Sequence, residues 1–163
     1  MPNSVPRAVV DAFYQAYISR DPEQIGAMLD EDVEWYVAGP VEVMQVCGYW
    51  RGKAAVIDRF ARIVPQVIEF KSLDTECLLV DGDSSALFGR IACLHRPTGR
   101  LICHRVAHIV RYRNGKVVYF RVINDSLDAA EQYIGHRINL KDDAVSTCSD
   151  LVPFELAPAL TPI

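Results

Sequence analysis

Acidic residues are missing from a quarter of this 163-residue chain. The stretch 84–124 contains no Asp or Glu, although it carries eight of the seventeen Lys and Arg residues. A site in which two carboxylates activate water is therefore excluded from this stretch. The basic run is local, because the whole chain has a formal net charge of −4 and a pI of about 5.5. That balance argues against nucleic acid and anionic membranes as general partners.

Paired cysteines and long apolar runs are also absent. The five cysteines are odd in number and show no CxxC spacing, so neither a disulfide framework nor a zinc site is indicated. No apolar run is long enough to cross a bilayer, and the first residues do not form a basic and then apolar leader. We therefore expect a cytoplasmic protein without metal or cofactor, and with neither nucleic acid nor a membrane as partner.

The residues that are present have the balance of one folded domain, with 50% hydrophobic and 23% charged residues. Apolar spacing predicts a helix over 5–19, a short one after Asp21 and a third from Lys53 to Pro65. A first strand is expected at 33–37, followed by a segment to Gly52 that is either a long loop or a strand extension and could cover a pocket mouth. Alternation then predicts four more strands and a short final helix. Their ranges are 73–80, 84–95, 100–112 and 116–125 for the strands and 126–133 for the helix.

Helices followed by a meander of strands predict an α+β fold, in which three N-terminal helices pack on a curved, mainly antiparallel sheet. No internal repeat is visible in the sequence. We expect residues 1–135 to form the domain and residues 136–163 to be a C-terminal tail extension of the same domain.

An ordered set of short motifs resembles a known family. Its most specific parts are Asp21, Asp32-Val33-Glu34-Trp35, Arg51-Gly52, and the run from Thr98-Gly99-Arg100 through Ala107-His108 to Asp125. In this order they resemble the SnoaL-like and ketosteroid-isomerase-like proteins of the nuclear transport factor 2-like superfamily. The resemblance covers roughly residues 5–133 and implies a cone-shaped α+β barrel. That family includes isomerases, cyclases, epoxide hydrolases and non-catalytic binding domains, so the resemblance does not select a function.

The resemblance also implies which family mechanisms lack their residues here. The three catalytic positions of the steroid isomerases fall at Phe13, Val37 and His108, so the proton-abstracting base is missing at Val37. The His–Asp pair of the SnoaL-type cyclases falls at His108 and Val122. The histidine is therefore kept and its acid is lost.

Epoxide hydrolases of this fold use an Asp-Arg-Asp set that falls at Ala92, Arg90 and Val122, where only the arginine remains. Steroid isomerisation and epoxide hydrolysis are therefore disfavoured. Two interpretations stay open. One is a cofactor-free isomerase, cyclase or lyase. The other is a non-catalytic domain that binds a ligand or a protein through the cavity or the convex sheet face.

The turn between the last two strands decides which residues share a face with His108. A two-residue turn sets His108 opposite Arg121, whereas a three-residue turn sets it opposite Phe120. The family's His–acid pairing needs the second arrangement, which we therefore predict. In it, His108 shares the concave face with Val122 and Asn124.

We predict that His108 donates or accepts a proton, with Asn124 or Arg90 as polarising groups. The alternative is a hydrogen-bonded histidine of the core. Aromatic residues near the expected pocket favour a small, flat, apolar and carbonyl-bearing molecule as ligand. The predicted lining consists of Phe13, Tyr17, Trp35, Val37, Phe60, Arg90, Val122 and Asn124.

The convex face of the sheet packs on a second subunit in many relatives, so the resemblance implies a homodimer. Arg105, Arg121 and Asp125 are expected to form ion pairs there. Arg90 and Ala92 are expected on the concave face, and Cys93 on the convex one.

Overall fold

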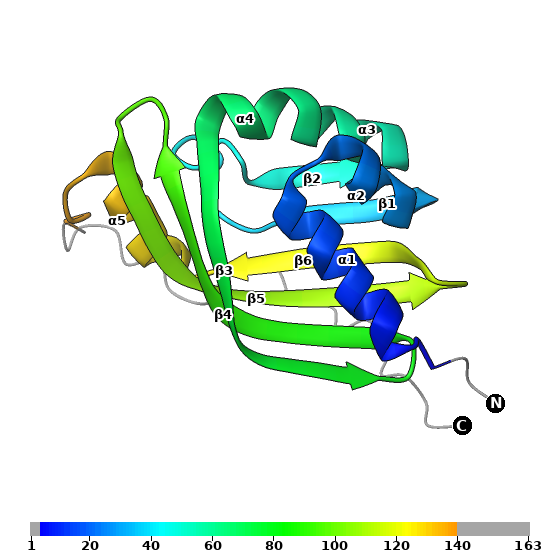
Figure 1. The fold of residues 1–163 in the computed structure, drawn as a ribbon. Coiled ribbons are helices and arrows are strands. Elements are labelled where there is room, and N and C mark those ends of the chain that lie inside the picture. Colours follow the sequence, from blue (N-terminus) through cyan, green and yellow to red (C-terminus); the bar gives the residue numbers. More distant parts are fainter. Residues whose placement is uncertain (1–3, 140–163) are drawn as a thin grey trace, which may run out of the picture.

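The structure of this protein is a computed structural model that describes residues 4–139. The part of the expected tail from residue 140 to 163 lies outside the described residues. Helices dominate the first half of the described chain and strands the second (Figure 1). In chain order the elements are α1 (Arg7–Ser19), α2 (Pro22–Met28), β1 (Leu29–Val37), β2 (Gly48–Arg51), α3 (Lys53–Asp58), η1 (Arg59–Ile63), α4 (Val64–Val67), β3 (Ile68–Asp81), β4 (Ser84–His95), β5 (Arg100–Arg113), β6 (Lys116–Asn124) and α5 (Ser126–Ile134).

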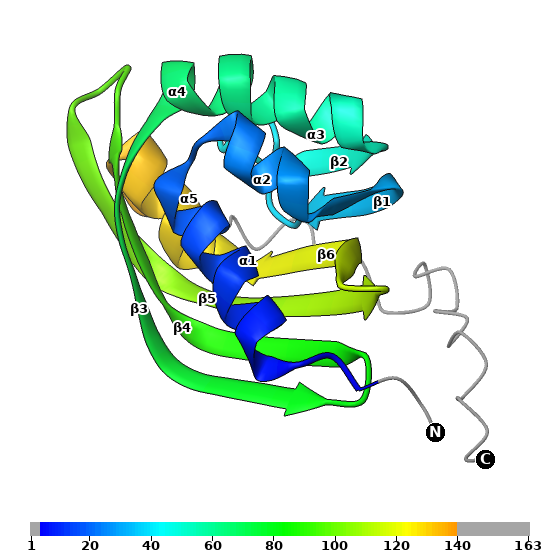
Figure 2. The same cartoon turned by 45° about the vertical axis from the view of Figure 1, so that its right-hand side comes forward.

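The six strands form one sheet in the order β2-β1-β6-β5-β4-β3. Only the β1–β6 pair is parallel among the strand pairs of the described chain. The sheet is strongly curved, and α1 to α4 lie over its concave side (Figure 2). The predicted α+β fold, with N-terminal helices on a curved and mainly antiparallel sheet, is confirmed.

The second helix begins as its sequence predicts. Asp21 occupies the N-cap, and its carboxylate accepts hydrogen bonds from the backbone N–H groups of Glu23 and Gln24 at 2.9 and 3.4 Å. Pro22 fills the first helical position, where no N–H donor is needed. The first helix begins at Arg7, two residues later than expected, because Pro6 occupies its N-cap.

Pro65 does not end the third helix, contrary to the prediction. The helix continues through η1, a π-helical segment in which the Val64 N–H donates to the Arg59 carbonyl five residues earlier. This wider turn places Pro65 in the first turn of α4, a position that proline tolerates. The π-helical segment also carries two consecutive buried side chains, Arg59 and Phe60.

The segment before Gly52, expected as a loop or a strand extension, contains both a loop and the strand β2. β2 pairs antiparallel with β1 and sets Trp50 opposite Trp35. Between the two strands, Met44 and Val46 are buried and form part of the core. This connection therefore packs against the domain, and Met44 and Val46 also line a cavity there.

A glycine marks the bend of the sheet. β3 is interrupted by irregularities between Phe70 and Ser72 and between Thr75 and Cys77. Gly89 on β4 lies opposite Thr75, and a Cβ atom there would approach the Asp74 carbonyl oxygen to 2.3 Å. Because only glycine lacks that atom, β3 and β4 come into close contact where the sheet curves.

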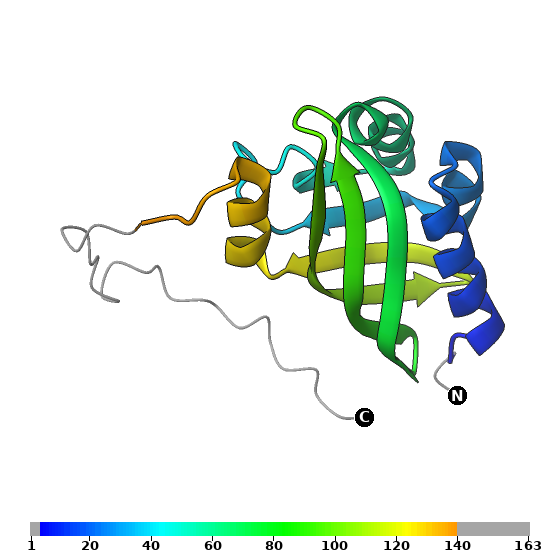
Figure 3. The ribbon, with the colours of Figure 1, turned by 60° about the vertical axis from the view of Figure 1, so that its left-hand side comes forward.

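The last helix closes the end of the sheet beyond β6 (Figure 3). The side-chain amide of Gln132 donates to the Cys103 carbonyl and accepts from the Cys103 N–H, both at 2.8 Å. It therefore satisfies the backbone of β5 where β6 has already ended. Arg100 adds a hydrogen bond from its Nη1 to the Tyr133 carbonyl at 3.0 Å.

The last hairpin has the predicted face but not the predicted turn. Arg113 pairs with Lys116 across a two-residue turn, and an irregularity between Arg111 and Tyr112 then shifts the register by one residue. His108 consequently pairs with Val122, so the expected three-residue turn and the Phe120 partner were wrong. The face shared with Val122 and Asn124 is nevertheless confirmed, because a one-residue bulge reverses the alternation.

The facing of β4 is the opposite of the prediction. His95 pairs with Arg100, so odd-numbered residues of β4 share the concave face with even-numbered residues of β5. Arg90 and Ala92 therefore lie on the convex side, whereas Cys93 is buried opposite Ile102. The sequence did not indicate the correct face, because the adjacent residues Leu87 and Phe88 point to opposite sides of the sheet and are both apolar.

Candidate functional site

A cavity of about 40 Å³ lies between the inner face of the sheet, the π-helical segment and α5. This volume accommodates about three water molecules. Most of its wall is apolar, with side chains such as Val37, Met44, Val46, Val64, Ile91 and Val122. Polar groups reach it from Tyr17, Arg20, Arg59, His104, Asn124 and Tyr133. The cavity therefore combines an apolar wall with a few directed polar groups, as small-molecule sites do.

Half of the predicted pocket residues line this cavity, namely Tyr17, Val37, Val122 and Asn124. Of the other three on the concave side, Phe13 and Trp35 belong to the aromatic core, whereas Phe60 packs on Trp35 and also borders a neighbouring groove. The ring centroids of Trp35 and Phe120 are 4.0 Å apart, and those of Phe13 and Phe120 are 5.5 Å apart. These rings pack on one another, so no space for a ligand remains among them. Arg90 is exposed on the opposite side of the sheet and lies outside the cavity.

His108, the predicted catalytic residue, lies inside the core and does not line the cavity. Its ring packs on Tyr14, Tyr17 and Phe120, with centroids 5.9, 5.3 and 5.1 Å away. Neither ring nitrogen has a hydrogen-bond partner among the described residues. Burial, with a smaller contribution from the Arg20 charge, lowers the pKa of His108 to about 3. The imidazole is therefore neutral near pH 7, and no group of residues 4–139 is placed to exchange a proton with it.

His104, four residues earlier on β5, is the histidine that borders the cavity. Its Nε2 lies 3.1 Å from Oδ1 of Asn124, and Nδ2 of Asn124 donates to the Ala38 carbonyl at 2.6 Å. Because that amide group is a donor, Oδ1 is an acceptor and Nε2 must carry the hydrogen. The lone pair is then on Nδ1, which is buried without a partner among the described residues.

The electrostatic environment keeps His104 neutral. Burial lowers its pKa below the ordinary value, although the hydrogen bond that it donates to Asn124 acts in the opposite direction. A neutral imidazole with a free Nδ1 lone pair is a proton acceptor. The sequence signal for this residue was its shared facing with His108. Both are buried, but His104 borders the cavity and has Asn124 as a hydrogen-bond partner.

Two arginines at the cavity were not predicted. Arg59 is only 5% exposed, and its Nη2 donates to the Val46 carbonyl at 2.8 Å. Arg20 follows α1 with a left-handed backbone conformation (φ 57°). Its guanidinium carbon lies 4.1 Å from the ring centroids of both Tyr17 and Phe70. Neither residue stands out in the sequence, because their facing depends on the π-helical segment and on the end of α1.

A second hollow adjoins the cavity. It is a groove of about 290 Å³ whose walls include Ser19, Phe60, Phe70 and Arg96. Arg20, Val64 and Ile68 border both the cavity and the groove. These three side chains therefore separate the inner cavity from a larger and more open space.

Other kinds of site find little support in residues 4–139. No three His, Cys, Asp or Glu side chains there are grouped to bind a metal ion. The Cys47 thiol donates to the Ala38 carbonyl at 3.5 Å, and burial raises its pKa to about 11, which disfavours the nucleophilic thiolate. Among the helices of this part of the chain, none has the length and apolar character needed to cross a membrane.

Comparisons with known proteins agree with this architecture. Residues 10–120 match the family model described as SnoaL-like domain. A proposed isomerase from Rhodopseudomonas palustris is 25% identical, with a TM-score of 0.71 over 78% of this chain and 97% of that one. A nuclear transport factor 2-like protein of unknown function from Burkholderia pseudomallei is also 25% identical, with a TM-score of 0.68 over 78% and 95%.

A more distant likeness concerns the fold alone. An LEH-like epoxide hydrolase from M. tuberculosis is 17% identical, with a TM-score of 0.63 over 78% of this chain and 88% of that one. No curated protein matches the sequence. The family model spans more than two thirds of the chain and agrees with the curved sheet under N-terminal helices. This chain belongs to the SnoaL-like domain family of nuclear transport factor 2-like proteins.

Proposed function

We propose that this protein binds a small, apolar, carbonyl-bearing molecule in the cone cavity and the groove that adjoins it, and moves a proton at the carbon next to that carbonyl. This step is common to isomerases and cyclases, and it needs no cofactor. His104 is the proposed proton acceptor, and Asn124 is the residue that orients it. His104 thus takes the proton-transfer role that was predicted from the sequence for His108.

The observation that carries this proposal is the His104–Asn124 pair at the wall of an apolar cavity. The contact of Asn124 with the Ala38 carbonyl leaves the lone pair of His104 on Nδ1. That nitrogen is buried and has no competing donor among the described residues. A neutral base of this kind removes a proton from a carbon acid without the carboxylate that other members of the fold use.

Hydrogen exchange on simple ketones tests the proposal. The protein is incubated in D₂O with 1-indanone or 2-tetralone, and deuterium at the carbon next to the carbonyl is measured by mass spectrometry. We expect exchange above the buffer rate, reduced at least tenfold in His104→Gln, because general-base catalysis contributes about 10²–10⁴-fold. Asn124→Leu should reduce exchange less, because it disturbs only the orientation of the imidazole.

The matched control is His95→Gln. His95 lies outside the cavity and its Nδ1 is 2.8 Å from Oγ1 of Thr98, so this variant should exchange like the wild type. Equal exchange in the wild type and His104→Gln would contradict the proposal, provided that both unfold at similar temperatures.

A second candidate function is binding without turnover. One observation favours this function: no Asp or Glu is found among the described residues that line the cavity. A thermal-shift screen separates the two functions, because a ligand that stabilises the protein without any exchange indicates a binding domain.

A further inference from the structure

The buried arginine at the cavity has an incomplete set of partners. Arg59 donates from Nη2 to the Val46 carbonyl, but its Nε has no acceptor among the described residues. The guanidinium carbon lies 4.6 Å from the ring centroid of Trp50 and 4.9 Å from that of Phe60. The aromatic rings hold the charge in place, but they do not neutralise it. Burial lowers the pKa of Arg59 to about 10, so it stays protonated at neutral pH.

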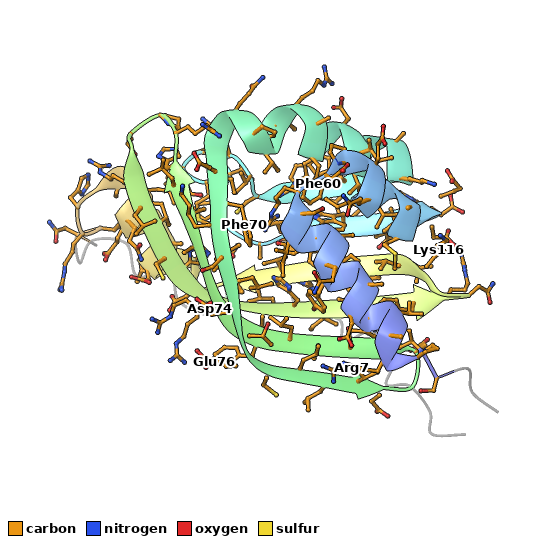
Figure 4. All side chains as sticks on the ribbon, viewed as in Figure 1. Arg7, Phe60, Phe70, Asp74, Glu76 and Lys116 are labelled. Carbon is orange, nitrogen blue, oxygen red and sulfur yellow. The ribbon has the colours of Figure 1, made fainter. Side chains whose placement is uncertain are left out.

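A second guanidinium with unused donors borders the same cavity. Nε and Nη2 of Arg20 are buried and have no acceptor among residues 4–139. The group is stacked between Tyr17 and Phe70, and Phe60 lies 5.9 Å from it. Figure 4 shows Phe60 and Phe70 on either side of the end of α1. Arg20 is the residue that follows this helix. Stacking therefore holds Arg20 in place without satisfying its hydrogen bonds.

No carboxylate within residues 4–139 forms an ion pair with either of these two cations. The ion pairs of the described residues involve other basic side chains, none of them Arg20 or Arg59. A buried charge without a partner is costly, and a fold that keeps two of them at one cavity leaves a site for an anion. A guanidinium presents parallel N–H donors that match the two oxygens of a carboxylate.

We infer that the ligand of the cavity is an apolar carboxylic acid that also carries a carbonyl group, and that Arg59 and Arg20 bind its carboxylate. The inference rests on the proposed function and narrows its substrate class. The cavity is large enough for the carboxylate group. The apolar body extends past Arg20, Val64 and Ile68 into the adjoining groove.

Two probes that differ only in charge test the inference, namely 4-oxo-4-phenylbutanoate and its amide, 4-oxo-4-phenylbutanamide. Binding to the full-length protein is measured by isothermal titration calorimetry. We expect the carboxylate to bind at least tenfold more tightly than the amide. Arg59→Met should remove this preference, and Arg20→Met should reduce it. Arg90→Met is the matched control, because Arg90 is exposed on the other side of the sheet and should leave both affinities unchanged.

A second readout needs no ligand. Because Arg59→Met replaces an unbalanced buried charge with an apolar side chain of similar length, its unliganded form should melt at a higher temperature than the wild type. Should this variant fail to fold, Arg59→Lys replaces it. Lysine keeps the charge but not the paired donors, so it should weaken the carboxylate about tenfold and leave the amide unchanged.

Equal affinities of the wild type for acid and amide would overturn the inference, as would an acid preference that is undiminished in folded Arg59→Met or Arg59→Lys. These outcomes are distinct from failure of the proposed function. His104-dependent exchange on neutral ketones without any preference for the acid would leave that function standing and remove only the anion site.

Discussion

At the scale of single residues, the surrounding side chains distinguish two buried histidines that the sequence presents as equivalent. His104 and His108 lie four residues apart on β5 and point to the same side of the sheet. His108 is enclosed by aromatic rings, whereas His104 borders the cavity and has Asn124 as its partner. The chemical difference between them therefore arises from their neighbours, not from their own residue type.

The buried His108 predicts how stability depends on pH. Its pKa is about 3 in the folded protein, below the ordinary value of about 6.5 in the unfolded chain. Below pH 6.5 the unfolded chain binds a proton that the folded protein does not. The free energy of unfolding therefore falls by about 1.4 kcal/mol per pH unit from this residue. Between pH 7 and pH 5 the loss is about 2 kcal/mol.

Urea unfolding at pH 7 and pH 5 measures this loss. His108→Phe should remove about 2 kcal/mol of the difference between the two pH values, because phenylalanine does not titrate. His136→Gln changes an exposed histidine and should retain the wild-type difference. An unchanged difference in His108→Phe would show that His108 takes up its proton in the folded state.

At the scale of elements, short irregularities decide where side chains point. The π-helical segment carries Arg59 into the interior, and one extra residue in β6 returns Val122 to the face of His108. Neither irregularity has a clear signal in the apolar pattern. A helix or strand drawn with ideal periodicity would place both residues differently.

At the scale of elements, we predict that replacing Gly89 destabilises the contact between β3 and β4. In Gly89→Ala the new Cβ atom would lie 2.3 Å from the backbone oxygen of Asp74, so β3 and β4 must separate at the bend. We expect a loss of about 1–3 kcal/mol in the free energy of unfolding, measured in urea. The control is Gly99→Asn, since Gly99 has open space around it and asparagine tolerates its left-handed conformation. A Gly89→Ala variant as stable as Gly99→Asn would show that the close contact is absent in solution.

At the scale of the whole molecule, the convex face of the sheet combines exposed apolar side chains with arginines. Phe88, Ile109 and Ile123 are 39%, 39% and 44% exposed. The strand pairing places Arg90, Arg105, Arg111 and Arg121 on the same face. Asp74, labelled in Figure 4, lies on the edge strand β3 and pairs with Arg90 of β4. An uncovered apolar surface of this kind is typical of an interface, which favours the expected homodimer.

Self-association through this face is tested with Ile109→Lys. Lysine at the centre of an already basic surface would bury a charge without a partner, so the variant should be monomeric at concentrations where the wild type is a dimer. Sedimentation velocity measures the difference. Leu127→Lys makes the same chemical change on α5, where Leu127 is 58% exposed, and should leave the dimer intact. The homodimer proposal would be contradicted if the wild type stayed monomeric when its concentration was raised to 100 times the lowest one studied.

The sequence by itself determined the fold class, most elements and the pocket side of β6. Apolar periodicity and turn residues are local properties, and they predicted the Asp21 cap, the strands of the meander and the shared face of His108, Val122 and Asn124. It also determined that no acid stands on the central strands, which weakens the carboxylate mechanisms of the fold.

The tertiary structure decided which polar groups meet at the cavity. Arg90 points outward because the β4–β5 pairing sets its parity, and Arg59 points inward because a π-helical turn rotates it. His104 rather than His108 borders the cavity, because aromatic rings from α1 and β6 surround His108. Such outcomes depend on register and on contacts between residues far apart in the chain. A one-residue shift reverses the side of the sheet on which each strand residue points.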